Sequence, residues 1–322
     1  MLYLGVPLSY GCIRKQHFNE ILDRILGRIF SWKNKLLSFG VRVMLINSVL
    51  TSIPMHTFSV VKPPKGTVER MEKIMISFLW DAKGEGRCQW ASWGRLARPV
   101  EEGGVGLRDT QDTILCLQTK LAWEIIGGES LWAKFFNMRY RWREAAVTRG
   151  ATVLAKCMFS HLETLSNYTI WVVGHGDLSF WNDNWAGEIL AFPGCSCPDI
   201  SFRDACDQYD FIHATLNPSL MSQFDGIIMS DETDLCCFSE SNSGRYNSSG
   251  YREILRRDRN LEVRDPFVWC SEVPTRMNFL LWRVCNMALP TEENIQKKGV
   301  DIASRCYCCA NPQTETTTHL FF

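Results

Sequence analysis

Apolar residues recur at intervals of three and four positions along the first third of the chain, a spacing typical of amphipathic helices. It predicts one helix over residues 17–39, a second at about 41–53 that stops before Pro54, and a third that starts after Pro64. A fourth helix is predicted at about 109–127. The positions expected to be buried in the first three helices are Phe18, Ile21, Leu22, Ile25, Leu26, Ile29, Phe30, Val43, Ile46, Val49, Leu50, Ile53, Val68, Met71, Ile74, Met75, Phe78 and Leu79.

The pattern changes after about residue 150. Two apolar and aromatic runs within residues 169–181 flank a Gly-His-Gly-Asp turn, which predicts a β-hairpin. Residues 186–265 are polar and rich in turn-forming residues, and we expect them to be loosely ordered. His161 and His175 stand alone in the sequence and are interpreted as structural. The chain is therefore predicted to be mainly α-helical with a small β-hairpin region.

The formal net charge of zero hides an uneven distribution. Residues 1–150 carry 22 Lys and Arg against 13 Asp and Glu, a net charge of +9, and the rest of the chain carries −9. This split favours RNA or DNA as a partner of residues 1–127, although a solvated basic surface explains it equally well. The side chains expected at phosphates are Arg24, Arg28, Lys33, Lys35 and Arg42.

Further features of the sequence argue against a membrane-spanning protein, a secreted protein and a nucleotide site. No apolar run approaches the roughly 18–20 residues of a membrane-spanning helix, and the N-terminus lacks the pattern of a secretory signal. We therefore expect an intracellular protein without a membrane partner, whose 14 cysteines are reduced thiols or metal ligands. The glycine-rich segment 103–107 is not followed by Gly-Lys-Ser/Thr, so it predicts a tight turn rather than a nucleotide site. No small-molecule substrate is indicated.

The clearest chemical signal lies near the C-terminus. Cys306 and Cys309 form a Cys-x-x-Cys pair, and His319 follows. Two thiolates and an imidazole can bind one tetrahedral zinc ion. A free thiol pair beside a histidine is the alternative, and Cys308 leaves open which two thiols would bind. No fourth ligand is apparent in this segment, so we expect a weak or incomplete zinc site.

These residues resemble the zinc-binding domain of reverse transcriptases from plant non-LTR (LINE-type) retrotransposons. The resemblance rests on Trp282-Arg283, Ala288–Thr291, Asn294, Gly299, the Cys-x-x-Cys pair and His319–Phe322. Earlier segments follow the order of the region after the polymerase palm in such proteins. They include Tyr3–Leu8, Trp32-Lys33, Leu36–Ser38, Arg42, Ile53-Pro54, Phe78–Trp80, Trp90, Gly103–Leu107 and Phe180–Trp185.

The resemblance implies three parts. Residues 1–127 would form a helical thumb-like region, residues 128–265 an irregular connector with the β-hairpin near 169–185, and residues 266–322 a small helical zinc-binding domain. Because the family continues to a further cysteine beyond the His-Leu-Phe-Phe motif, this domain is expected to be truncated at its C-terminus.

The family's polymerase site uses carboxylates that hold two metal ions, including an adjacent Asp-Asp pair. No Asp-Asp pair occurs in this sequence. The resemblance therefore implies a noncatalytic fragment of an RNA-directed DNA polymerase that retains nucleic-acid and zinc binding. The alternative is a structural or protein-interaction relic that binds no nucleic acid.

Overall fold

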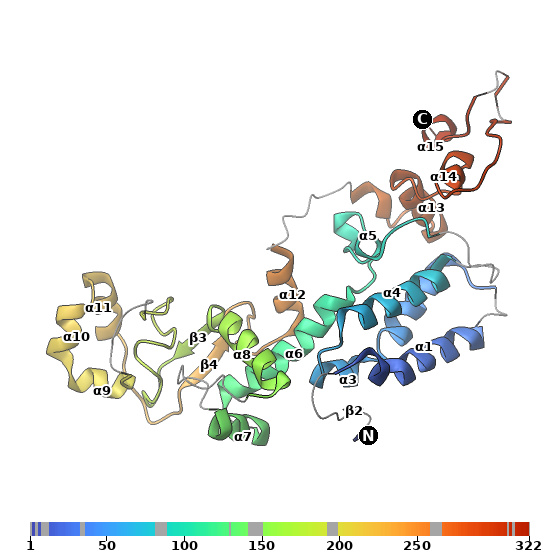
Figure 1. Cartoon of the computed structure of the whole chain (residues 1–322). Helices are drawn as coiled ribbons and strands as arrows, with labels where there is room; N and C mark the ends of the chain where they lie inside the picture. The colour runs from blue at the N-terminus through green and yellow to red at the C-terminus, as the bar shows by residue number, and fades with distance from the viewer. Residues whose placement is uncertain are drawn as a thin grey trace. The chain divides into compact units, whose positions relative to one another are not determined.

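In the computed structural model the chain forms two compact units. Figure 1 colours the chain by residue number, so the residues of each unit can be found in it. Unit 1 comprises Met1–Ile114 and Arg259–Phe322, and unit 2 comprises Leu115–Asp258. The structure describes residues 2–3, 6–7, 13–32, 36–80, 89–128, 130–140, 151–191, 199–257, 266–307, 309–310 and 313–321. The predicted class is confirmed: the described residues are mainly helical, with two small antiparallel sheets of two strands each. The sequence suggests three consecutive parts, whereas unit 1 contains residues from both ends of the chain.

Unit 1 consists mostly of short helical segments. In chain order they are η1 (Lys15–Phe18), α1 (Asn19–Trp32), α2 (Phe39–Leu45), the π-helical η2 (Ile46–Leu50), α3 (Met55–Val60), α4 (Lys65–Trp80), α5 (Trp93–Leu96), η3 (Val100–Glu102), η4 (Pro266–Trp269), α13 (Thr275–Cys285), α14 (Glu292–Gln296) and α15 (Thr317–Phe321). Strand β1 (Leu2–Tyr3) pairs antiparallel with β2 (Val6–Pro7). Helix α6 (Thr110–Gly127) begins in unit 1 and continues into unit 2.

The helices predicted from apolar periodicity are present, with different ends. The first stops at Trp32, and α2 begins after Ser38, whose hydroxyl accepts a hydrogen bond from the Val41 N–H as an N-cap. The predicted second helix is split into α2 and η2. Helical turns then continue past Pro54, which caps the start of α3, a position where its missing N–H costs nothing. Phe30, expected to be buried, is exposed on α1.

The C-terminal helices of unit 1 share a core with its N-terminal helices. Phe279 of α13 packs with its ring centroid 5.0 Å from that of Phe39 at the start of α2 and 4.9 Å from Trp269. Trp282, one turn further along α13, is 0% exposed. The zinc-domain segment suggested by the sequence is therefore anchored on the helices that follow the N-terminus.

The glycine-rich segment 103–107 forms the tight turn that the sequence predicts. Gly103 has a φ of 74°, a left-handed conformation that favours glycine. A Cβ atom on Gly104 would lie 1.9 Å from the Arg98 carbonyl oxygen, so no other residue fits there. The Gly103 carbonyl accepts a 2.8 Å hydrogen bond from the Trp282 indole N–H. The turn thus serves packing within unit 1.

Unit 2 begins with the rest of α6. Its further elements are α7 (Leu131–Tyr140), α8 (Val153–Ser166), β3 (Thr169–Val172), α9 (Phe202–Asp207), α10 (Tyr209–Thr215), α11 (Pro218–Asp225), β4 (Leu235–Phe238) and α12 (Ser248–Arg257). No described helix in either unit combines the length and the apolar character needed to cross a bilayer.

The expectation that residues 186–265 are loosely ordered is wrong for the described part of this range. Helices α9 and α11 each start with a side-chain N-cap, Ser201 and Asn217, and pack on a cluster of aromatic rings. This cluster contains Phe180, Trp185 and Phe202, with ring centroids 5.1–5.9 Å apart. Helices of six to eight residues contain too few turns to show a clear period, which explains why the sequence pattern missed them.

The expected hairpin within residues 169–181 is also corrected. Strand β3 pairs antiparallel with β4, with Thr169 opposite Phe238 and Val172 opposite Leu235. The second apolar run instead enters the aromatic cluster of unit 2. Beyond this run, the Asn184 carbonyl accepts a 2.7 Å hydrogen bond from the Trp171 N–H of β3. The turn between the two runs does not close a hairpin, because its N–H groups bind a carboxylate that lies directly before the strand that pairs with β3.

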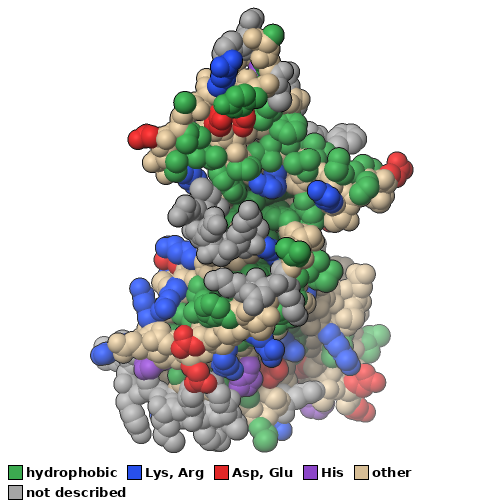
Figure 2. Space-filling model, turned by 90° about the vertical axis from the view of Figure 1, so that its right-hand side faces the viewer, with side chains coloured by type: hydrophobic (Ala, Val, Ile, Leu, Met, Phe, Trp, Pro, Cys, Tyr) green, Lys and Arg blue, Asp and Glu red, His purple; other side chains and the backbone are tan. Residues whose placement is uncertain are grey.

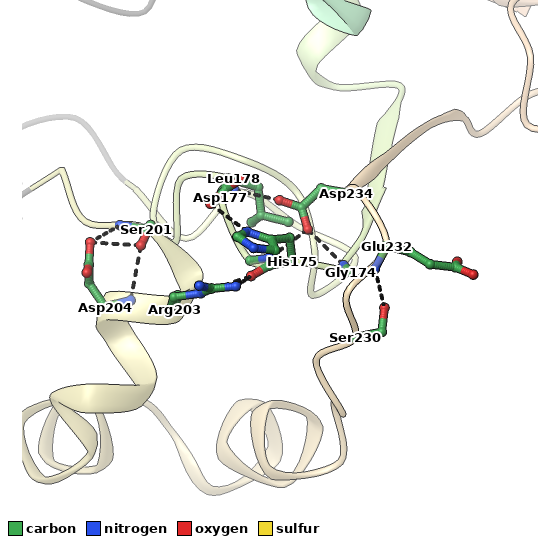
Figure 3. Close-up of polar contacts among 11 residues, drawn as sticks. Gly174, His175, Asp177, Leu178, Ser201, Arg203, Asp204, Ser230, Glu232 and Asp234 are labelled. Atoms are coloured by element: carbon green, nitrogen blue, oxygen red, sulfur yellow. Dashed lines mark hydrogen bonds and ion pairs between the residues drawn. The ribbon is translucent and has the colours of Figure 1, made fainter.

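That carboxylate belongs to Asp234, directly before β4. It accepts hydrogen bonds from the backbone N–H groups of Gly174 and Gly176, both at 2.8 Å, and of Leu178 at 2.9 Å. Figure 3 shows the side chain pointing into the loop that contains these groups. Burial alone raises the pKa of Asp234, but the backbone N–H groups outweigh it and hold the pKa below its ordinary value.

We expect Asp234→Asn to lower the free energy of unfolding of unit 2 by about 1.5–3 kcal/mol at neutral pH, because the amide presents a donor to the Leu178 N–H. A carboxylate with a lowered pKa stabilises the fold fully above its ordinary pKa of 3.8, and this contribution disappears as the pH falls through the lower folded value. The difference between variant and wild type should therefore shrink below that pH. Urea denaturation followed by circular dichroism measures both effects.

The matched control is Asp231→Asn, which makes the same chemical change at an exposed residue of the same loop. It should change stability by no more than about 0.5 kcal/mol. Equal effects of the two substitutions, or a loss at Asp234 that stays constant with pH, would argue against the carboxylate as the centre of this loop.

Candidate metal centre

The three predicted metal ligands lie at the C-terminal end of unit 1. The Cys306 N–H donates a 2.7 Å hydrogen bond to the Gln313 carbonyl, which brings the two sides of the ligand loop together. Thr316 then caps the start of α15, because its hydroxyl accepts a hydrogen bond from the His319 N–H at 3.0 Å. The loop places both cysteines beside α15, and α15 presents the imidazole of His319.

The ligand atoms of Cys306, Cys309 and His319 lie within 4.8 Å of one another. The two sulfur atoms are 3.8 Å apart, and the Cys309 Sγ is 2.8 Å from the His319 Nε2. Cys306 is 1% exposed, and the other two are half-buried. The structure therefore brings together all three residues that the sequence singles out.

This geometry can be compared with a tetrahedral site. At zinc–sulfur and zinc–nitrogen distances of about 2.3 and 2.0–2.1 Å, neighbouring ligand atoms lie about 3.5–3.8 Å apart. The observed distance of 3.8 Å between the two sulfur atoms matches this separation of neighbouring ligand atoms. The 2.8 Å distance from the Cys309 Sγ to the His319 Nε2 is shorter than this, and it would lengthen by less than about 1 Å for both atoms to become ligands. The donor set and its spacing fit a metal ion.

Helix α14 braces the ligand loop through polar contacts that the sequence does not reveal. The Glu292 carboxylate accepts a 2.8 Å hydrogen bond from the Arg305 N–H, next to Cys306. The Gln296 amide donates to the Ile302 carbonyl at 2.6 Å, and the Glu293 N–H donates to the Glu315 carbonyl at 3.3 Å. No short motif predicts such contacts, because they depend on how two separated segments meet. Cys308, the third thiol considered from the sequence, lies outside the described residues.

The residues predicted to contact phosphates do not form one group. Arg24 and Arg28 are exposed and lie one turn apart on α1, so they share a face of that helix. Lys33 and Lys35 lie outside the described residues. Figure 2 shows Lys and Arg side chains spread over the middle of one face, with fewer Asp and Glu side chains between them.

Arg42 has a different role from the one predicted. It is only 7% exposed, and its Nη1 donates hydrogen bonds to the carbonyl oxygens of Phe78 and Leu79 at 3.1 and 3.4 Å. Its guanidinium also lies over the Phe78 ring, 5.8 Å from the centroid. A cation at the C-terminal end of α4 satisfies carbonyl groups that have no partner within the helix. Arg42 is thus a structural residue and is removed from the set of phosphate contacts.

Comparison with known proteins adds a second line of evidence. Residues 246–322 match the family described as zinc-binding in reverse transcriptase. The match begins before the boundary at 266 expected from the sequence and includes all three ligand residues. None of the solved structures matches the chain.

Two curated relatives are also similar. A protein of Arabidopsis thaliana named for ribonuclease H is 25% identical over 334 residues, which cover 94% of this chain and 54% of the relative. The uncharacterized 149 kDa protein of transposon TX1 from Xenopus laevis is 31% identical over 110 residues, or 33% of this chain and 8% of the relative. The chain thus spans about half the length of the first relative and a small part of the second. With the family match, these similarities support a likeness of the chain to the C-terminal region of non-LTR retrotransposon reverse transcriptases, and residues 246–322 are similar to their zinc-binding domain.

Proposed function

We propose that this chain is a noncatalytic part of a reverse transcriptase that binds zinc at Cys306, Cys309 and His319 and binds nucleic acid through the basic surface of unit 1. The observation that carries the proposal is the convergence of these three ligand atoms within 4.8 Å, inside the segment that matches the zinc-binding family. Thiolate and imidazole ligands favour zinc over magnesium or calcium.

The proposed role of zinc is structural. A zinc ion held by the ligand loop and α15 would supply folding free energy to a segment that contains few buried apolar residues. Because α13 and the ligand loop belong to the same unit as α1 to α4, the ion would fix a module that is already anchored on the basic helices. Zinc would thus support the shape of a nucleic-acid-binding surface.

Nucleic acid as the partner is supported by the family and by the charge of +9 over residues 1–150, of which residues 1–114 in unit 1 carry +6, from 16 Lys and Arg against 10 Asp and Glu. Arg24 and Arg28 are the best candidates for phosphate contacts among the described residues, because both are exposed on one face of α1. We further propose that the chain itself does not polymerise DNA, since its sequence contains no adjacent Asp-Asp pair. The competing proposal is a structural or protein-interaction role, which predicts no salt-sensitive binding of nucleic acid.

We expect the double variant Arg24→Ala/Arg28→Ala to bind RNA and DNA more weakly than the wild type. Each lost phosphate contact should reduce the slope of the logarithm of the binding constant against the logarithm of the salt concentration by about 1, so the double variant should lose about 2. Fluorescence anisotropy with a labelled RNA hairpin and a labelled DNA duplex, measured over a series of salt concentrations, gives these slopes.

The control is Lys134→Ala/Arg139→Ala, which removes two exposed positive charges from α7, outside residues 1–127. Its slope should remain close to that of the wild type. The nucleic-acid proposal fails if the wild type shows no salt-dependent binding. The assignment to α1 fails if both double variants reduce the salt slope by the same amount.

A further inference from the structure

A second group of metal-ligating side chains lies in unit 2, on the facing sides of α6 and α8. Cys157 and His161 are four residues apart on α8, so they lie on the same side of the helix. Gln118 of α6 contacts both of them. His161, which the sequence presents as an isolated structural histidine, is therefore part of a cluster with a thiol and an amide oxygen.

The three polar atoms form a nearly equilateral triangle. The Cys157 Sγ is 3.5 Å from the His161 Nε2 and 3.4 Å from the Gln118 Oε1, and the His161 Nε2 is 3.4 Å from the same oxygen. A tetrahedral zinc ion with one sulfur, one nitrogen and one oxygen ligand would separate these atoms by about 3.4–3.6 Å. All three distances agree with that face of a tetrahedron.

Thiol hydrogen bonds can account for the two distances to the Cys157 sulfur, but they leave the third distance unexplained. An N–H···O hydrogen bond usually has a donor–acceptor distance of about 2.7–3.2 Å, and the distance from His161 to Gln118 is 3.4 Å. The other imidazole nitrogen, Nδ1, lies 3.4 Å from the Thr119 hydroxyl, a weak contact on the side of the ring away from Nε2.

Burial and access also suit a bound ion. Gln118 and Thr119 are buried and His161 is 6% exposed, so the imidazole is held by its surroundings before any ion arrives. Cys157 is half-buried, which leaves the sulfur side of the triangle accessible. A thiol and an imidazole select soft or borderline divalent cations over magnesium and calcium.

We propose that Cys157, His161 and Gln118 form a second metal site, which binds a zinc-like divalent cation and clamps α6 to α8. This site is independent of the C-terminal ligands, because all of its residues lie in unit 2. Nothing in the similarity to the reverse transcriptase zinc-binding family assigns it, since the family match covers residues 246–322.

Zinc titration of the full chain against a zinc-binding dye, under reducing conditions, tests the proposal. In a Cys309→Ser background, which weakens the C-terminal site, we expect one tightly bound zinc ion per chain. Adding Cys157→Ser or His161→Gln should remove it. Adding Cys206→Ser, the same change at a half-buried cysteine of α9, should leave it in place.

A gain-of-function variant keeps the test valid if these substitutions disturb folding. Gln118→Glu replaces the neutral oxygen with a carboxylate, so it should tighten zinc binding by about tenfold or more if this oxygen is a ligand. With cobalt in place of zinc, the sulfur-to-metal charge-transfer absorption should be present in this variant and absent after Cys157→Ser. Binding that is unchanged by Cys157→Ser and by Gln118→Glu, or no bound ion in the Cys309→Ser background, would overturn the proposal.

Discussion

Replacing Trp282 by alanine is expected to lower the free energy of unfolding of unit 1 by about 3–5 kcal/mol, the usual cost of removing a large buried aromatic side chain. Trp282 is fully buried in the core that α13 shares with the N-terminal helices. The substitution also removes the 2.8 Å hydrogen bond that the Gly103 carbonyl accepts from the indole N–H. Chemical denaturation followed by far-ultraviolet circular dichroism measures the loss.

The neighbouring substitution Leu281→Ala provides the control. Leu281 lies on the same helix and is 42% exposed, so its truncation should cost less than about 1 kcal/mol. If Trp282→Ala costs no more than Leu281→Ala, then α13 does not anchor the C-terminal segment in the core of unit 1. A large loss at Trp282 alone confirms that the two ends of this sequence stabilise each other.

Replacing Cys309 by serine is expected to weaken zinc binding at the C-terminal site by more than about 100-fold. Loss of a residue that hydrogen-bonds to a metal ligand already lowers metal affinity by about 10–100-fold, and a ligand itself contributes more. The Cys309 sulfur is the atom that contacts both of the other ligand atoms. Competition with a chelator, measured in a Cys157→Ser background, isolates this site.

Cys285→Ser is the matched control, because it removes an exposed thiol from α13 of the same unit. It should leave the zinc affinity within about threefold of the Cys157→Ser parent. Equal losses in the two variants would show that the effect comes from general disturbance of the unit rather than from the ligand.

Local sequence patterns predicted the longer helices well. Helices α4 and α6 each repeat their apolar positions over several turns, so the period stands out from the surrounding sequence. The proximity of the three candidate ligands could also be expected, because Cys306 and Cys309 are held together by their spacing and only His319 had to be added. For the same reason the glycine-rich turn at 103–107 could be expected.

Features that depend on distant parts of the chain could not be predicted in this way. Strand β3 finds its partner more than 60 residues later, and the Asp234 carboxylate that redirects the intervening loop has no motif of its own. Arg42 looks like any basic residue in the sequence, and only the carbonyl groups at the end of α4 explain its burial. His161 appears isolated until α6 brings Gln118 beside it.

Zinc K-edge X-ray absorption on the zinc-loaded chain, in the Cys157→Ser background, tests the assignment of Cys306, Cys309 and His319 most directly. The spectrum reports which atoms surround the ion and at what distance. We expect two sulfur atoms at about 2.3 Å and at least one imidazole nitrogen at about 2.0–2.1 Å. A shell made only of nitrogen and oxygen atoms, or one of four sulfur atoms without imidazole, would contradict the proposed site.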